Sequence, residues 1–155
     1  MSSPKSNARQ VALQALYQWQ VTDHDLLTLS RQFEADPETP KYHKAYFEVL
    51  VGGVMDNLQE LDAAITEFTT RDFEKIDPIE KAVLRLGTFE LLFKPEVPYR
   101  VIINESINLA KSFGSEKSHA YVNSILDKLA QKNRAAEIKA KTKATTKIKK
   151  TSTKK

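Results

Sequence analysis

The 155-residue sequence contains no cysteine. Structural disulfides and Cys-ligated zinc sites are therefore excluded, and a reducing cytoplasm is the natural setting for such a chain. Long apolar runs are absent too, since none approaches the ~18 residues that a membrane span requires. The amino terminus, MSSPKSNARQ, lacks the apolar core of a secretion signal. We therefore expect a cytoplasmic protein that makes no contact with a membrane.

Glycine and strand-forming patterns are also scarce. Only four glycines occur, and alternating runs rich in Val, Ile and Thr are missing. Both features disfavour a sheet protein. Hydrophobic residues make up 41% of the chain and charged residues 28%, which is a balance typical of globular domains. The composition thus predicts a folded all-α chain.

Residues that could support catalysis are sparse and scattered. His24, His43 and His119 fall in different segments, and none has metal-ligand spacing to an acid or another histidine. Gly52-Gly53 lacks the flanking pattern of a phosphate-binding loop, and no serine has a nucleophile-elbow context. We therefore predict no catalytic residue, no metal site and no cofactor, so the protein is expected to act by binding and not as an enzyme.

Apolar residues recur at three- and four-residue spacing through most of the chain, which is typical of amphipathic helices. Asn57 followed by Glu60 resembles a capping box and indicates two helices in the middle region. Asp77-Pro78 is a strong helix start, and Gly114 is a candidate C-terminal cap. Close helix packing is one reason to tolerate Gly52-Gly53 inside a helix. These patterns predict a compact bundle of six or seven helices over residues 6–131, after a flexible segment at 1–5.

Basic residues concentrate at the C-terminus. Residues 132–155 hold ten Lys or Arg and one acid, Glu137, which leaves this segment at +9 and the body at −5. Apolar periodicity ends near Lys132, so we expect a disordered basic tail over 132–155. The tail is either a polyanion-binding segment or a solubilising one, and composition alone does not separate the two.

Some side chains in the predicted body suggest macromolecular binding. Lys5 and Arg9 open the first helix, where they could grip phosphates or could belong to an ordinary mobile terminus. Tyr17, Tyr99 and Tyr121 could stack on bases, although partial burial against the core is the commoner role. Polar residues also interrupt the apolar stripes of the later helices, either as buried networks or as plain exposed faces. These are Glu80, Lys81, Arg85, Glu90, Asn104, Glu105, Asn108 and Asn123.

Several ordered segments carry a family resemblance. They are ARQVALQALYQW at 8–19, IEKAVLRLGTFEL at 79–91, VPYRVIINE at 97–105 with AKSFG at 110–114, and YVNSILD at 121–127. Together they resemble the NusB family over about residues 6–130. The closing segment departs slightly, because the family usually has Phe first and Gly fourth.

The resemblance implies an all-helical fold of two packed helical subdomains. It also implies a transcription antitermination factor, which pairs with NusE, a small-subunit ribosomal protein, and binds the boxA element of nascent ribosomal RNA leaders. With other Nus factors, such a complex joins RNA polymerase and limits premature termination. The positions implied to meet RNA are Lys5, Arg9, Gln14, Tyr17, Phe68, Arg71, Arg100 and Asn104. Those implied to face NusE are Glu74, Glu80, Lys117 and Tyr121.

The amino terminus departs from the often arginine-rich family pattern, since only Lys5 and Arg9 precede or open the helix. Because the body carries a charge of −5, we expect it to recognise single-stranded RNA through base stacking and base edges. We expect it to share this recognition with a protein partner.

Two alternatives stay open. NusB-like domains are also fused to RNA cytosine methyltransferases, although this chain has no cofactor-binding βαβ segment. The family can also self-associate, so a structural homodimer is the third hypothesis.

Overall fold

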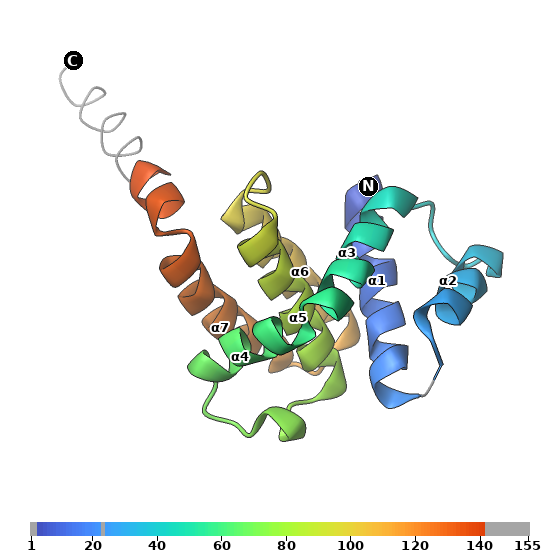
Figure 1. Ribbon diagram of the computed structural model, residues 1–155, viewed down its shortest axis with the longest axis horizontal. Coiled ribbons are helices and arrows are strands. Elements are labelled where there is room, and N and C mark those ends of the chain that lie inside the picture. The colour runs from blue at the N-terminus through green and yellow to red at the C-terminus, as the bar shows by residue number, and fades with distance from the viewer. Residues whose placement is uncertain (1–2, 23, 142–155) are drawn as a thin grey trace, which may run out of the picture.

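The computed structural model describes residues 3–22 and 24–141, which form helices and no strand (Figure 1). Seven α-helices and one short 3-10 helix follow each other in the order α1 (Pro4–Val21), α2 (Leu26–Ala35), α3 (Lys44–Asp56), α4 (Leu58–Phe68), η1 (Phe73–Lys75), α5 (Pro78–Phe93), α6 (Tyr99–Phe113) and α7 (Ser118–Asn133). Within the described ranges, no helix is both long and apolar enough to cross a membrane.

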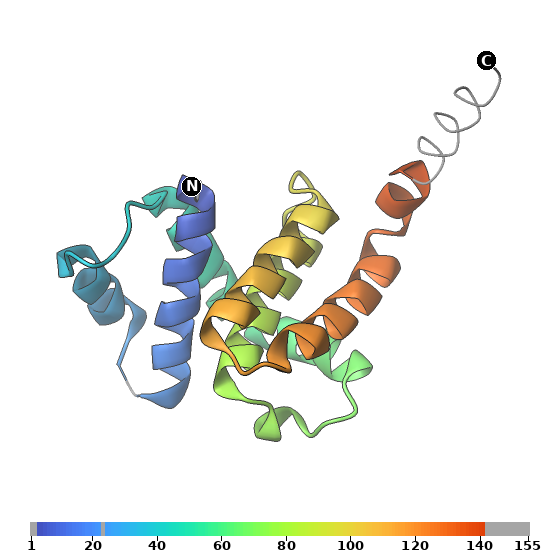
Figure 2. The same ribbon diagram turned by 180° about the vertical axis from the view of Figure 1, so that it is seen from behind.

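The helices form two packed groups, α1–α3 and α4–α7 (Figures 1 and 2). Helix α5 joins them, because it packs against α1 and α3 on one side and against α4, α6 and α7 on the other. Its residues from Ala82 to Leu91 are all buried. The prediction of an all-α bundle of two helical subdomains is therefore confirmed.

Local sequence signals explain most helix boundaries. The Asp77 carboxylate accepts hydrogen bonds from the backbone N–H groups of Ile79 and Glu80 at 2.9 and 3.3 Å, and Pro78 occupies the first turn. Gly114 ends α6 as expected, with its N–H bonded to the carbonyl of Ala110. Helices α3 and α4 are separate, but Asn57 provides no side-chain cap and its amide instead donates to the carbonyl of Gly53.

The start of α1 differs from the expectation. Ser3 caps the helix by accepting from the N–H of Ser6, and Pro4 occupies its first turn. Pro4 and Lys5 are therefore helical, whereas we expected a flexible segment at 1–5. The pair Ser3-Pro4 is a cap with proline at the first position, the same local device that begins α5.

Gly53 allows α3 and α5 to pack closely. A Cβ atom at this position would lie 2.2 Å from the Phe89 ring, so any side chain would require the ring or the helices to shift. The packing reason we proposed for the glycine pair thus applies to Gly53. It does not apply to Gly52, where a Cβ would meet nothing within 4 Å.

The C-terminal expectation needs a correction over residues 132–141. Lys132 and Asn133 complete α7, Arg134 is buried, and residues 135–141 are helical. Arg134 donates to main-chain carbonyls near the end of α5, which fixes this segment to the body. The rest of the predicted tail, 142–155, lies outside the described residues.

Candidate nucleic-acid interface

A polar groove lies between the N-terminal half of α1 and the C-terminal half of α6, with a volume of about 430 Å³. The two helices run side by side in Figure 2. Helical spacing of three or four residues places one polar row on each wall. Ser6 and Gln10 on α1 and Asn108 and Ser112 on α6 line the groove. At the same spacing, the α1 row continues beyond the groove to Gln14 and Tyr17, and the α6 row includes Arg100 and Asn104 before it. We call these two rows and the groove between them the α1–α6 surface.

Four of the predicted RNA residues lie on this surface. Arg100 and Asn104 are exposed, and Gln14 and Tyr17 are half-buried. Side-chain amides can both donate and accept hydrogen bonds, which suits base edges, while a tyrosine ring can stack on a base. Gln10 and Ser112 were not among the predicted site residues. Their position four residues from Gln14 and Asn108 is the signal that could have found them.

Arg9 is not on the surface as we expected. Its side chain is buried, and its Nε and Nη2 donate to the two carboxylate oxygens of Glu90 at 2.8 Å each. A guanidinium held in this way is not presented to an RNA phosphate, so Arg9 acts as a structural residue beneath the groove. Lys5 is exposed, and its ammonium lies 5.2 Å from the centre of the Tyr46 ring on α3.

A buried polar network fixes the groove from below. The Tyr46 hydroxyl donates to Glu90 Oε2 at 2.5 Å, and burial together with this hydrogen bond raises the pKa of Tyr46. Glu105 lies 3.7 Å from Arg9 Nη1 and accepts a hydrogen bond from the hydroxyl of Ser6. These contacts connect α1, α3, α5 and α6. Of the two alternatives for the polar residues of α5, the buried network is thus confirmed for Glu90.

A second cluster lies at the start of α7. The Arg71 guanidinium stacks 4.0 Å above the Tyr121 ring, and its Nη1 lies 3.4 Å from Glu80 Oε2. Ser118 Oγ donates to the other Glu80 oxygen at 3.0 Å, and the hydroxyls of Thr69 and Tyr121 are 2.5 Å apart. We call Thr69, Arg71, Glu80, Ser118 and Tyr121 the Arg71 cluster.

The Arg71 cluster combines residues from both predicted sets. Arg71 was implied to meet RNA, whereas Glu80 and Tyr121 were implied to face the protein partner. The Glu80 side chain is only 6% exposed, so our prediction that it lies on the surface is wrong. Arg71, with 51% of its side chain exposed, and half-buried Tyr121 are the members that a partner can contact.

Other predicted residues lie close in the sequence to members of this cluster. Glu74 and Lys117 are exposed, on η1 and immediately before α7. Phe68 is half-buried at the end of α4, with the Lys132 ammonium 6.0 Å from its ring centre. Helix α6 begins at Tyr99 and ends at Phe113, and Ser118 opens α7 after it. The Arg71 cluster and the Arg100 end of the α1–α6 surface are therefore separated by the length of α6.

Arg85 forms a further polar contact. From the sequence, Arg85 could belong either to a buried network or to an exposed face. It is buried, forms a two-point ion pair with Asp62 at 2.9 and 2.8 Å, and donates to Gln20 at 2.9 Å. Helices α1, α4 and α5 are thereby connected. Arg85 therefore belongs to the interior, as Glu90 does.

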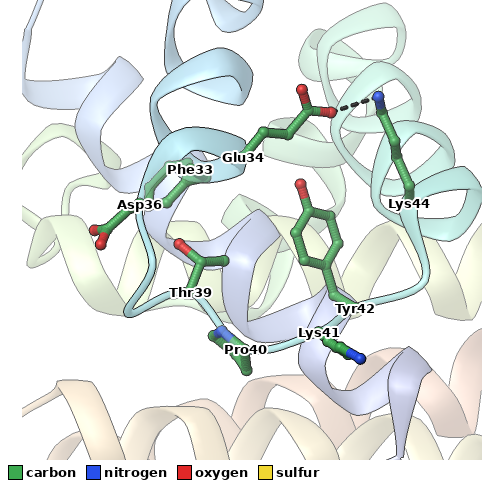
Figure 3. A pocket seen from close by; sticks show the side chains of 8 residues that line it. All are labelled: Phe33, Glu34, Asp36, Thr39, Pro40, Lys41, Tyr42 and Lys44. Carbon is green, nitrogen blue, oxygen red and sulfur yellow. Dashed lines mark ion pairs between the residues drawn. The ribbon is translucent and has the colours of Figure 1, made fainter.

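Another cavity, of about 420 Å³, opens between α2 and the start of α3 (Figure 3). Glu34 and Lys44 form an exposed ion pair at its edge, with Tyr42 close by. It contains none of the predicted site residues and no converging set of buried polar groups. Among residues 3–22 and 24–141, no cluster of His, Cys, Asp or Glu has the arrangement of a metal site.

Comparison with known proteins gives a consistent result. The NusB family model matches residues 6–131. A transcription antitermination protein NusB of Nitrosococcus oceani is 48% identical over 141 residues, covering 91% of this chain and 95% of the relative. A NusB of Shewanella halifaxensis is 44% identical, covering 85% and 98%.

Solved structures share the fold. T. maritima NusB has a TM-score of 0.72 at 33% identity and covers 84% of this chain and 93% of its own. A chain from the crystal structure of antitermination factors NusB and NusE in complex with dsRNA has a TM-score of 0.72 at 23% identity, covering 81% and 95%. At that identity the second likeness supports the fold alone.

Proposed function

The chain belongs to the NusB family of transcription antitermination proteins, which are not enzymes, and we propose that it binds boxA-type RNA of nascent ribosomal RNA leaders together with NusE. With other Nus factors the complex would join RNA polymerase and limit premature termination. The observation that carries this proposal is the α1–α6 surface, where amide and hydroxyl groups of α1 and α6 line one groove and the polar rows continue along both helices beyond it.

The chemistry of the groove favours single-stranded RNA. Its walls are mostly uncharged, and the body as a whole is acidic, so phosphate attraction alone would give little affinity. Asn104, Asn108 and Gln14 can instead bond base edges, and Tyr17 can stack. Arg100 adds one exposed cation at the start of α6.

A basic protein partner would compensate for the negative charge of the body. A ribosomal protein that brings basic surface would add the phosphate contacts that the acidic body lacks. We place NusE at the exposed part of the Arg71 cluster, with Glu74 and Lys117 beside it. The structural neighbour holds NusB and NusE with dsRNA, and we propose that this chain likewise assembles with NusE and RNA.

Binding of boxA-type RNA with and without NusE tests this proposal. We expect weak binding by the chain alone and at least a tenfold gain when NusE is present. Asn104→Ala should lower the affinity of the complex by roughly tenfold, since a two-point amide contact to a base is worth about 1–3 kcal/mol. Lys44→Ala, on the α2–α3 side, is the matched control. No gain from NusE would contradict joint recognition.

A further inference from the structure

We propose that the groove of the α1–α6 surface holds one guanine base of the RNA, and that the Glu105 carboxylate on α6 binds the Watson–Crick edge of this base. The inference rests on the proposed function and deepens it, because it assigns a base and a base-binding residue to the same groove. Glu105 was one of the polar residues that could belong either to a buried network or to an exposed face. It was not among the predicted RNA residues.

The groove has the lining that a single base requires. Leu109 and Phe113 form its apolar part, and Phe113 is half-buried, so its ring remains accessible to the face of a base. The rest of the lining is polar, and Glu105 is its one charged residue among the described part of the chain. Small-ligand sites commonly combine apolar walls with a few placed polar groups in this way.

The Glu105 carboxylate is held from one side only. Its Oε1 accepts a hydrogen bond from the Ser6 hydroxyl at 2.5 Å and lies 3.7 Å from Arg9 Nη1. No donor within residues 3–22 and 24–141 bonds its Oε2, and 25% of the side chain is exposed. A carboxylate accepts hydrogen bonds on both oxygens. Oε2 is therefore available to a bound base, while the contacts of Oε1 fix the orientation of the group.

The charges beneath the groove favour a base over a phosphate. The Arg9 guanidinium is already matched by Glu90 in a two-point ion pair at 2.8 Å. Glu105 adds a second carboxylate to this one guanidinium, so the three side chains together leave one negative charge at the groove. A negative charge repels RNA phosphates, whereas it strengthens hydrogen bonds from the N–H groups of a base.

Guanine is the base whose Watson–Crick edge fits a carboxylate. Its N1–H and its 2-amino group lie side by side, so they can donate to the two carboxylate oxygens. Adenine and cytosine each present one amino group next to a ring nitrogen that accepts, and the N3–H of uracil lies between two carbonyl oxygens. These acceptors would face the carboxylate and repel it. Single-stranded RNA exposes the Watson–Crick edge, which a duplex hides.

Replacement of single guanines by inosine tests this inference, because inosine lacks only the 2-amino group. A boxA-type RNA is prepared in versions that each carry one inosine in place of one guanosine. Each version is titrated with the complex of NusE and either the parent chain, Glu105→Gln or Glu105→Asp. Glu48→Gln, at an exposed position of α3, is the matched control.

Inosine at one position should weaken binding by the parent roughly tenfold, which is the loss typical of one hydrogen bond to a charged acceptor. At this position Glu105→Gln should bind guanosine and inosine alike, because its amide places a donor against the base. Glu105→Asp should lose the preference too, because the shorter side chain withdraws the carboxylate. Glu48→Gln should keep the tenfold preference, and inosine at other positions should affect all four proteins equally.

Two results would overturn the inference while the proposed function stands: no guanine at which inosine weakens the parent, or an inosine effect that persists in the folded Glu105 variants. Thermal unfolding identifies the folded variants. Glu105→Asp keeps the charge beside Arg9, so it decides the test if Glu105→Gln does not fold. If the parent chain with NusE binds no leader RNA at all, the proposed function fails and this inference fails with it.

Discussion

The carboxylate of Glu90 on α5 receives the guanidinium of Arg9 on α1 in a two-point ion pair, with both N–O distances at 2.8 Å. The Arg9 and Glu90 side chains are 6% and 2% exposed, so water does not screen the pair. Its position connects the two helical groups directly beneath the α1–α6 surface. The pair therefore fixes α1 against α5, and Glu105, 3.7 Å from Arg9 Nη1, extends this contact to α6.

Arg9→Ala should lower the free energy of unfolding by about 3–5 kcal/mol, because it leaves the buried charge of Glu90 without its partner. Chemical denaturation measures this loss. For the folded variant, the slope of the logarithm of the RNA-binding constant against the logarithm of salt concentration should stay unchanged, because Arg9 makes no phosphate contact. Arg31→Ala, at an exposed position of α2, is the control and should change stability by less than about 0.5 kcal/mol. A normal stability combined with a shallower salt slope would place Arg9 on the RNA after all.

Glu80 and Arg71 should behave differently although they touch. Glu80→Lys puts a cation into a nearly buried site beside the Arg71 guanidinium, and should destabilise the fold by more than about 3 kcal/mol. Arg71→Ala removes the cation that faces Glu80, but because half of the Arg71 side chain is exposed it should cost only about 1 kcal/mol of stability. It should weaken NusE binding by roughly tenfold. Thermal unfolding measures the effect of each substitution on stability, and calorimetric titration with NusE measures its effect on partner binding. Equal effects of both substitutions on unfolding would contradict this assignment.

Arg134→Lys should destabilise the protein by about 2–3 kcal/mol, because an ammonium cannot reach the four main-chain carbonyls near the end of α5 that the guanidinium satisfies. Amide hydrogen exchange should quicken around the α5–α6 turn before it does elsewhere. Lys132→Ala, two residues earlier and on an exposed ion pair with Glu67, serves as the comparison and should cost less than about 1 kcal/mol. If the two substitutions cost the same, Arg134 does not cap α5.

Glu137 should contribute to stability in a pH-dependent way. Burial acts to raise its pKa, but the N–H of Tyr99 and the Arg134 guanidinium outweigh burial and hold the pKa of Glu137 below its ordinary value. A depressed pKa stabilises the fold above the unfolded value of about 4.3, and this contribution is lost as the pH falls through the folded value. Glu137→Gln should therefore lower stability at pH 7 and flatten its decline below about pH 4, as followed by thermal unfolding. An unchanged decline would contradict the role of Glu137.

The parts of the structure that depend on neighbouring residues in the sequence could be predicted. Asp77-Pro78 specifies the start of α5 by local geometry, and the spacing of the apolar residues specifies helices and their buried faces. Gly53 indicated a close helix crossing because a glycine inside a helix needs a packing reason. These signals need no knowledge of distant segments.

The parts of the structure that depend on residues far apart in the sequence could not be predicted. Arg9 looks like an exposed cation at a helix start until Glu90, 81 residues away, is placed beside it. Arg71 and Tyr121, assigned to different ligands, meet only after α4 and α7 have packed. Arg134 lies in a lysine-rich stretch typical of disorder, and most of its acceptors are main-chain carbonyls, which no side-chain pattern reveals.

The most direct test of the account is ultraviolet crosslinking of the complex with NusE to leader RNA, with the adducts mapped by residue. The account predicts that boxA nucleotides attach to the α1–α6 surface, above all at Tyr17, with further adducts near Asn104. Adducts gathered around Tyr42 on the α2–α3 side, or no adduct on α1 and α6, would contradict it.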